Sequence, residues 1–234
     1  LNTVTSALEA CENVSLDLIY GMPEQKLTEW QQDLAKAVSL GTKHISAYQL
    51  TIEPNTKFNT EVIRKKWEPL PDDTQADFYK ATEKFLETQN LHLYEISNFA
   101  HKGFECRHNF QIWEYGDYLG VGSGAHGRFK NKEKTRFLTQ HYKKPERYIK
   151  SVKHRETFYQ YQEVYEKDMV FEKTLMGLRL SCGISQKFAT YYLSNEKVTH
   201  LIQNGFMYTN NGRLAVTPKG RLVLDSILSV LLCE

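Results

Sequence analysis

The sequence predicts an α/β chain that ends in a small α+β domain. Strands expected at 15–20 and 44–52 flank a helix, which gives one βαβ unit of roughly 30 residues, the repeat of parallel α/β folds. A third strand is expected at 91–96. After residue 168, three expected helices are followed by a hairpin and a further helix, the order of a winged-helix domain. The expected domains are a parallel α/β region at 1–129, a basic linker at 130–167 and a winged-helix-like domain at 168–234.

The N-terminal elements follow from hydrophobic periodicity. Residues 2–12 suit a helix, and the first strand alternates, with Leu16 and Leu18 on one face and Asp17 on the other. Gly41 fits the left-handed residue that ends a helix. Because three strands cannot close a parallel barrel, we expect further strands upstream, in agreement with an opening residue other than Met. The two helices are expected from apolar residues at helical spacing: Leu27, Trp30, Leu34 and Val38 in the first, and Phe78, Ala81, Phe85 and Leu86 in the second.

The C-terminal domain is predicted mainly from its turns and caps. Asn211-Gly212 is a strong hairpin signal, and Thr217 followed by Pro218 should begin the last helix. The earlier helices are expected around Met169, Leu175, Leu178 and Leu180, at 185–193 and at 196–204. A domain that reads DNA needs a basic recognition helix, and 196–204 offers little positive charge, so we expect no nucleic-acid binding.

Composition excludes several classes of protein. Lys and Arg total 30 against 28 Asp and Glu, so no strong overall charge selects a nucleic acid or a membrane. No apolar run approaches 18 residues, so no transmembrane segment is expected. There is no sequence that resembles a signal peptide. The four cysteines are scattered and form no CxxC pair, which indicates reduced thiols and a cytoplasmic protein.

The expected linker is the exception to this even charge. Between 130 and 155 ten Lys or Arg face two Glu, interleaved with Phe137, Tyr142 and Tyr148. Such a stretch could touch nucleic acid. We favour a solvated connecting helix that begins near Pro145.

Asp17 is the first candidate for chemistry. It points into a barrel if Leu16 and Leu18 face the helices. A buried carboxylate without a partner is costly, so we expect Asp17 to contact ligand hydroxyls or an amine. A capping or structural role at a strand edge is the alternative. Tyr48, in the same region of the next strand, suits stacking on a flat ligand, although a core aromatic is the commoner explanation.

A glycine-rich run gives a weaker signal. The residues from Gly122 to Gly127 spell GxGxxG, which in a dinucleotide site is followed by a helix. Here no amphipathic pattern follows. We interpret the run as a chance match whose glycines let backbone segments approach closely.

The last candidate cluster comprises Cys106, His108, Asn109 and Trp113, with His126 beyond them. Cysteine and histidine are ligands of haem iron, and aromatic rings pack on porphyrin faces. A hydrogen-bonded structural role for His108 is the alternative.

Three runs of sequence resemble one known family. They read SLDLIYGMP at 15–23, HISAYQLTIEPNT at 44–56, and YEISNFA, ECRHNFQIW and YLGVGSGAHGR between 94 and 128. They closely resemble the oxygen-independent coproporphyrinogen III oxidase-like radical-SAM proteins, most nearly the haem chaperone branch, whose pattern is HNxxYW. The resemblance covers essentially all of the chain. It implies the C-terminal part of a partial (β/α) barrel that carries a [4Fe–4S] cluster and S-adenosylmethionine, followed by a C-terminal domain.

The resemblance also implies what this chain lacks. The family's CxxxCxxC cluster loop lies upstream of Leu1, and none of the four cysteines replaces it. We therefore expect no metal ligands in this chain and no radical chemistry from it alone. The full-length protein of which it would be the C-terminal part is called the parent protein below.

The resemblance implies a role for individual residues of this chain. Asp17 matches the acid that contacts the ribose of S-adenosylmethionine. Ile112 stands where the haem-associated motif has Tyr, so a hydroxyl and some stacking surface are lost. The other matches are Ile19, Tyr48 and Thr51 in the S-adenosylmethionine pocket and His108, Asn109 and Trp113 in the haem-associated motif.

Three functions follow as expectations. The first is a haem chaperone that binds haem and transfers it to an acceptor protein. The second is an oxidase that decarboxylates coproporphyrinogen III, for which Arg107 and Arg128 could supply a basic pocket. The third is an interaction module that uses the winged-helix-like domain.

Overall fold

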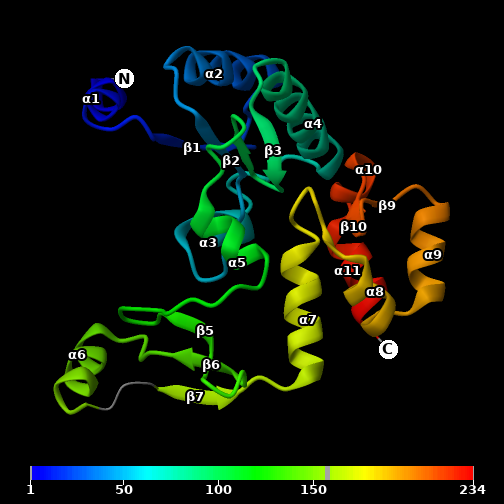
Figure 1. The fold of residues 1–234 in the computed structure, drawn as a ribbon. Coiled ribbons are helices and arrows are strands. Elements are labelled where there is room, and N and C mark those ends of the chain that lie inside the picture. The colour runs from blue at the N-terminus through cyan, green and yellow to red at the C-terminus, as the bar shows by residue number, and fades with distance from the viewer. Residues whose placement is uncertain (1, 156–158, 234) are drawn as a thin grey trace. The chain divides into compact units, whose positions relative to one another are not determined.

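The structure, a computed structural model, describes residues 2–155 and 159–233 and divides the chain into two compact units, Leu1–Cys106 and Arg107–Glu234. Both units combine helices with strands (Figure 1). In the described part of the chain, none of the helices has the length and apolar character required to traverse a bilayer.

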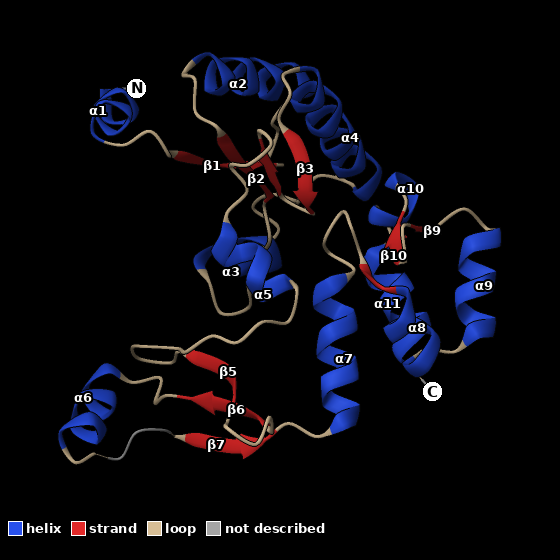
Figure 2. Cartoon of the chain, viewed as in Figure 1, coloured by secondary structure: helices blue, strands red, loops and turns tan. Residues whose placement is uncertain are grey.

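Unit 1 is a four-stranded mixed sheet with helices α2 and α4 packed on one face (Figure 2). The strand order is β1-β2-β4-β3, with β1 and β2 parallel and β4 antiparallel to both of its neighbours. Its elements are α1 (Asn2–Ala10), β1 (Ser15–Tyr20), α2 (Leu27–Ser39), β2 (His44–Gln49), α3 (Lys57–Ile63), α4 (Asp72–Thr88), β3 (His92–Glu95) and β4 (Asn98–Ala100). The three predicted strands are confirmed, although β2 ends at Gln49 and not at residue 52 as expected. Helix α3 and the short β4 were not predicted.

The core of unit 1 lies between α2, α4 and the sheet. The rings of Trp30 and Phe78 lie 5.2 and 6.1 Å from that of Tyr20. The Trp30 indole donates a 2.7 Å hydrogen bond to the buried Thr82 hydroxyl, so its one polar atom is satisfied. Leu34 at the centre has no exposed surface. The helix-facing residues of β1, Leu16 and Leu18 among them, pack against this core, which turns the alternate residues to the other face.

The first part of unit 2 is a three-stranded antiparallel sheet in the order β5-β6-β7. Phe137 stacks on Tyr161 at 4.8 Å, and Phe129 lies beside both rings. The helix expected near Pro145 is confirmed, but the strands were missed because charged residues alternate with these aromatic ones. The elements are α5 (Arg107–Trp113), β5 (His126–Lys130), β6 (Arg136–Gln140), α6 (Pro145–Lys153), β7 (Gln160–Glu163) and α7 (Glu166–Gly177).

The rest of unit 2 has the predicted winged-helix order. Asn211 and Gly212 form the hairpin turn with φ angles of 48° and 72°, the left-handed values that this tight turn requires. The two hairpin strands pair, and β8 adds a third strand beside β10. The expected last helix is instead two helices that meet near Val223, and Leu180 lies beyond the end of α7. The elements are β8 (Ile184–Ser185), α8 (Gln186–Tyr192), α9 (Asn195–Gln203), β9 (Met207–Asn210), β10 (Arg213–Val216), α10 (Pro218–Arg221) and α11 (Leu224–Leu232).

Candidate functional site

The face of the unit 1 sheet opposite α2 and α4 carries the first group of candidate residues. Parallel pairing aligns Asp17 with Ser46 and Ile19 with Tyr48, and aligned residues on neighbouring strands share a face. Ile19 and Tyr48 are the penultimate residues of their strands, 57% and 39% exposed. Thr51 lies beyond β2 and is exposed. The sheet therefore brings Asp17, Ile19 and Tyr48 onto one surface near the strand ends.

The expected burial of Asp17 is wrong for this structure. Its side chain is exposed, and among the described residues it has no hydrogen-bond or ion-pair partner. The reason is that Asp17 lies on β1, the edge strand of this sheet, and that α2 and α4 pack on the opposite face. An unpaired carboxylate near an exposed aromatic ring and an aliphatic side chain has the chemistry to accept hydrogen bonds from ligand hydroxyls and to pack against a flat ring.

A polar network on the same face was not found by sequence reasoning. The Ser46 hydroxyl donates a 2.7 Å hydrogen bond to Asn98, whose amide in turn donates to the Glu95 carboxylate. All three side chains are at most 3% exposed. Asn98 belongs to β4, so the pairing of β4 between β2 and β3 assembles this network.

His44 makes a second polar contact group at the start of β2. Its Nδ1 lies 2.7 Å from the Ser15 hydroxyl and its Nε2 lies 2.9 Å from the Tyr94 hydroxyl. Burial lowers the pKa of His44 below its ordinary value, and the negative charges of Asp17 and Glu105 oppose this effect only in part. The imidazole is therefore held in its neutral form as a hydrogen-bonding bridge.

The haem-associated residues lie on α5 in unit 2. Successive residues of a helix are turned by about 100°, so His108 and Ile112 lie on one side and Asn109 and Trp113 on the next. His108 is exposed, whereas Asn109, Ile112 and Trp113 are half-buried. Trp113 packs toward the end of α7, with the Arg179 guanidinium 5.6 Å from its ring centre. The histidine is thus accessible while the tryptophan anchors the helix.

A network of largely buried to half-exposed polar groups links the segment after α5 to α7. The Tyr115 hydroxyl donates a 2.7 Å hydrogen bond to Glu172 of α7. The Arg128 guanidinium also binds Glu172, with its closest contact at 2.7 Å, and the Arg136 guanidinium lies 3.8 Å above the Tyr115 ring. Arg136 is itself paired with Asp117 at 2.9 Å.

The charges in this network are matched. Burial alone would raise the pKa of Glu172, but hydrogen bonds from Arg128 and Tyr115 and the charge of Arg136 outweigh it, so the pKa lies below its ordinary value. Burial and the hydrogen bond to Glu172 raise the pKa of Tyr115. At neutral pH the network therefore contains an ionised carboxylate between a guanidinium and a neutral phenol.

The glycine run has a structural role. It leads into strand β5 and not into a helix, which excludes the dinucleotide-binding geometry. A Cβ atom on Gly120 would lie 2.2 Å from the His126 carbonyl oxygen, and one on Gly127 would lie 2.5 Å from the Thr139 hydroxyl. Gly120 lies just before the run, and within the run the predicted close approach is confirmed at Gly127 alone. It is wrong for the other two glycines, since a Cβ atom would meet nothing within 4 Å at Gly122 and only ordinary contacts at 3.7 Å at Gly124.

The cysteines do not gather. Cys11 and Cys233 are exposed and Cys106 and Cys182 are half-buried, and all four are free thiols. In residues 2–155 and 159–233, no three His, Cys, Asp or Glu side chains are grouped as a metal site would require.

Sequence comparison relates the chain to one set of proteins. It is 36% identical over 233 residues to "Heme chaperone HemW" of Haemophilus influenzae and 31% identical over 238 residues to the Bacillus subtilis protein of the same name, with 95% of the chain covered in each case. It is 30% identical to the mitochondrial "Radical S-adenosyl methionine domain-containing protein 1" of Danio rerio. The chain spans 58%, 60% and 56% of these proteins, less than two thirds of each. No protein-family model matches it.

Structure comparison agrees at the level of fold. The coproporphyrinogen III oxidase HemN of Escherichia coli, described as a radical SAM enzyme, superposes with a TM-score of 0.72 over 98% of this chain and 57% of the oxidase, at 17% identity. The similarity of sequence and the similarity of fold point to the same group. The chain belongs to the radical-SAM, oxygen-independent coproporphyrinogen III oxidase-like family, and the relatives that it matches in sequence include proteins named haem chaperones.

Proposed function

We propose that the parent protein is a haem chaperone, which binds haem and transfers it to an acceptor protein. The observation that carries this proposal is the exposed His108 on a helix that Trp113 and Tyr115 anchor to the rest of unit 2. The similarity to proteins named haem chaperones supports it.

Each residue of α5 has a role in this proposal. The imidazole of His108 offers a lone pair to haem iron, and its exposure leaves it accessible to a planar ligand. The half-buried Trp113 provides aromatic surface at the next side of the helix, and Asn109 provides an amide donor and acceptor. Because Glu172 holds Tyr115, haem would meet a helix whose position is already set.

We further propose that the open face of unit 1 helps to hold S-adenosylmethionine in the parent protein. Asp17 would bind the ribose hydroxyls, and Ile19, Tyr48 and Thr51 would line the adenine and methionyl region. Ligands from the rest of the parent protein would hold a [4Fe–4S] cluster, which would supply an electron for reductive cleavage of S-adenosylmethionine. The residues of this chain would bind and orient the cofactor.

The oxidase alternative needs free positive charge for a substrate with several carboxylates. Arg128, one of its two candidates, is only 13% exposed and is already bound to Glu172. This engagement favours the chaperone over the oxidase. An anaerobic assay in which the parent protein forms protoporphyrinogen from coproporphyrinogen III would reverse that ranking.

Haem titration tests the chaperone proposal. We expect the parent protein to bind haem with a shifted Soret band, and His108→Ala to weaken the affinity by about tenfold or more because an iron ligand is lost. His200→Ala is the matched control, since His200 is also an exposed histidine of unit 2 and lies on α9, outside the candidate cluster. Equal Soret shifts and affinities in parent protein and His108→Ala would exclude His108 from the site.

A further inference from the structure

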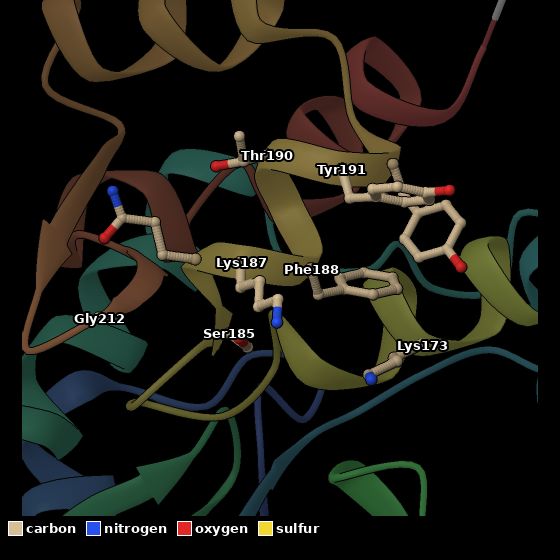
Figure 3. Close-up of a pocket in the computed structure, with 9 residues that line it drawn as sticks. Lys173, Ser185, Lys187, Phe188, Thr190, Tyr191 and Gly212 are labelled. Carbon is tan, nitrogen blue, oxygen red and sulfur yellow. The ribbon is translucent and has the colours of Figure 1, made fainter.

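A second concave surface lies in unit 2 outside α5. A pocket of about 950 Å³ opens beside α8 (Figure 3). We call it the α8 pocket; it is lined chiefly by Lys173 of α7, by Lys187, Phe188, Tyr191 and Tyr192 of α8, and by Gly212 of the hairpin turn. None of these residues belongs to the haem-associated motif.

The positive charge in the α8 pocket is not neutralised. Lys173 is half-buried, and among the described residues no carboxylate lies within ion-pair distance of its ammonium group. That group lies 4.5 Å from the centre of the Phe188 ring. The side chains of Lys173 and Lys187 extend toward one another from α7 and α8 (Figure 3). Two ammonium groups therefore face the same part of the pocket.

Other positive charges near Lys173 add to the positive electrostatic potential of the pocket. Burial lowers the pKa of Lys173, and the positive charges of Lys130, Arg136 and Arg213 lower it further. Arg136 is paired with Asp117, and Arg213 lies 3.8 Å from Glu114, so these two charges are partly balanced. A negatively charged group beside Lys173 would relieve the remaining repulsion.

The other wall of the α8 pocket is aromatic. Phe188 is buried, and Tyr191 is 78% exposed with its ring 4.6 Å from that of Tyr192. The Tyr192 hydroxyl donates a 3.0 Å hydrogen bond to Glu166, which ties this ring in place. The pocket thus combines an aromatic surface with two lysine side chains.

We propose that the α8 pocket binds an acidic segment of a partner protein, with a carboxylate between Lys173 and Lys187 and a neighbouring apolar side chain on Phe188 and Tyr191. The assignment rests on the proposed function in one respect, since the partner is taken to be the protein that receives haem. Complementary charge is the argument for this occupant, and an interface with an aromatic anchor and a charged neighbour is a common recognition pattern.

Two other occupants suit the pocket less well. Its lining contains no His, Cys or Met side chain that could coordinate iron, so a haem site would lack an axial ligand from the pocket. A DNA-reading winged-helix domain uses the helix before the hairpin, which here is α9, and the pocket lies on α8.

Fluorescence anisotropy with a labelled peptide of alternating Glu and Phe tests the proposal on the 234-residue chain. We expect Lys173→Met and Lys187→Met each to weaken binding about tenfold, because each removes a charged hydrogen bond while keeping the apolar stem. Lys173→Arg should retain binding. Lys219→Met is the matched control, since Lys219 lies 4.3 Å over the Phe206 ring but outside the pocket. A Gln–Phe peptide that binds as tightly as the Glu–Phe peptide would overturn the proposal.

Charge reversal and haem titration separate this proposal from the chaperone function. Lys187→Glu should bind a peptide of alternating Lys and Phe better than the unchanged chain does. Haem affinity should be the same with and without Lys173→Met; a loss of haem would make the pocket part of the haem site and overturn the peptide assignment. If the parent protein binds no haem while Lys173→Met still loses the peptide, the α8 pocket remains a peptide-binding site. The partner would then not be a protein that receives haem. If duplex DNA displaced the labelled peptide more strongly than unlabelled Glu–Phe peptide does, the assignment of the pocket to an acidic protein segment would be overturned.

Discussion

The two candidate sites are held in place by different forces. In unit 1, Ile19 and Tyr48 are neighbours because β1 and β2 pair in a parallel register over a buried core. In unit 2, the relative positions of His108 and Trp113 are set by one helix of 7 residues, none of which is buried. A helix of that length is unstable by itself in water, so its position depends on contacts that follow it in the chain.

This difference determines what damages each site. Surface residues of the sheet can change without moving their neighbours, since main-chain pairing and the core hold the strands. The α5 helix depends on a few side chains, of which Glu172 makes contact with both Tyr115 and Arg128. We therefore expect single substitutions near α5 to affect structure and binding together, and those on the open face of the sheet to affect binding alone.

The largest effect is expected from Glu172→Ala. The change leaves a partly buried Arg128 and the Tyr115 hydroxyl without their partner, which should lower the free energy of unfolding of unit 2 by about 3 kcal/mol. Urea unfolding, with amide hydrogen exchange of peptides from α5 and α7, would measure it. Haem affinity should fall as well. Asp77→Ala, which removes an exposed ion pair with Lys80, should cost less than about 0.5 kcal/mol. Equal costs would show that the network does not hold α5.

Asp17→Asn tests the candidate site on the sheet of unit 1. In the parent protein, binding of S-adenosylmethionine should weaken about tenfold, because a charged acceptor of ribose hydrogen bonds becomes a neutral one. The free energy of unfolding should stay within about 0.5 kcal/mol, since the side chain is exposed. Isothermal titration and urea unfolding measure the two quantities. Asp33→Asn, an exposed acid on α2, is the control for charge alone. A large loss of stability without a change in binding would contradict the proposed role.

Periodicity explains what could be predicted in unit 1. Half-buried and exposed residues alternate along most of β1, so its bounds and the face of Asp17 were predictable. The first four residues of β2 are all buried, and its expected end at residue 52 lies beyond the observed end at Gln49. The exposure of Asp17 was not predictable, because periodicity reports which residues share a face and not what covers it. The network of Glu95 and Asn98 depends on where β4 inserts, and three residues are too few to show a period.

The helix and strands of unit 2 that were not predicted depend on contacts between residues distant in sequence. The Arg107–Trp113 segment has no buried residue and none of the usual capping signals, so its helix is a product of tertiary contacts. In β5 and β6, Arg128 and Arg136 are paired in the fold, with Glu172 and Asp117, and a partner distant in sequence cannot be inferred from local pattern. The hairpin at Asn211 was predictable because its turn conformation favours only a few residue types.

A third, smaller effect concerns pH and unit 1. The pKa of His44 is lower in the folded chain than its ordinary 6.5, so the unfolded chain binds the proton more tightly. The stability that depends on neutral His44 is therefore present above about pH 6.5 and is lost as the pH falls through the folded pKa, at no more than about 1.4 kcal/mol per pH unit. Urea midpoints of unit 1 measured across this range should fall less steeply for His44→Asn. His92→Asn, at an exposed histidine of β3, is the control for removal of an imidazole from unit 1. An identical slope in His44→Asn would show that another group titrates.

The smallest expected effect is a change in haem affinity on substitution of Ile112 in α5. Ile112 stands one helical turn from His108, so Ile112→Tyr places a phenol on the same side as the imidazole and restores the HNxxYW pattern. The added ring gives a porphyrin more stacking surface, and we expect haem affinity to rise about threefold, which corresponds to less than about 1 kcal/mol. Ile112→Phe separates the contributions, since it adds the ring without the hydroxyl. If both variants bind haem no better than the unchanged chain while His108→Ala still weakens binding, the ligand contacts the imidazole but does not extend over this side of the helix. The site would then be smaller than the motif, and α5 would serve mainly to present one histidine.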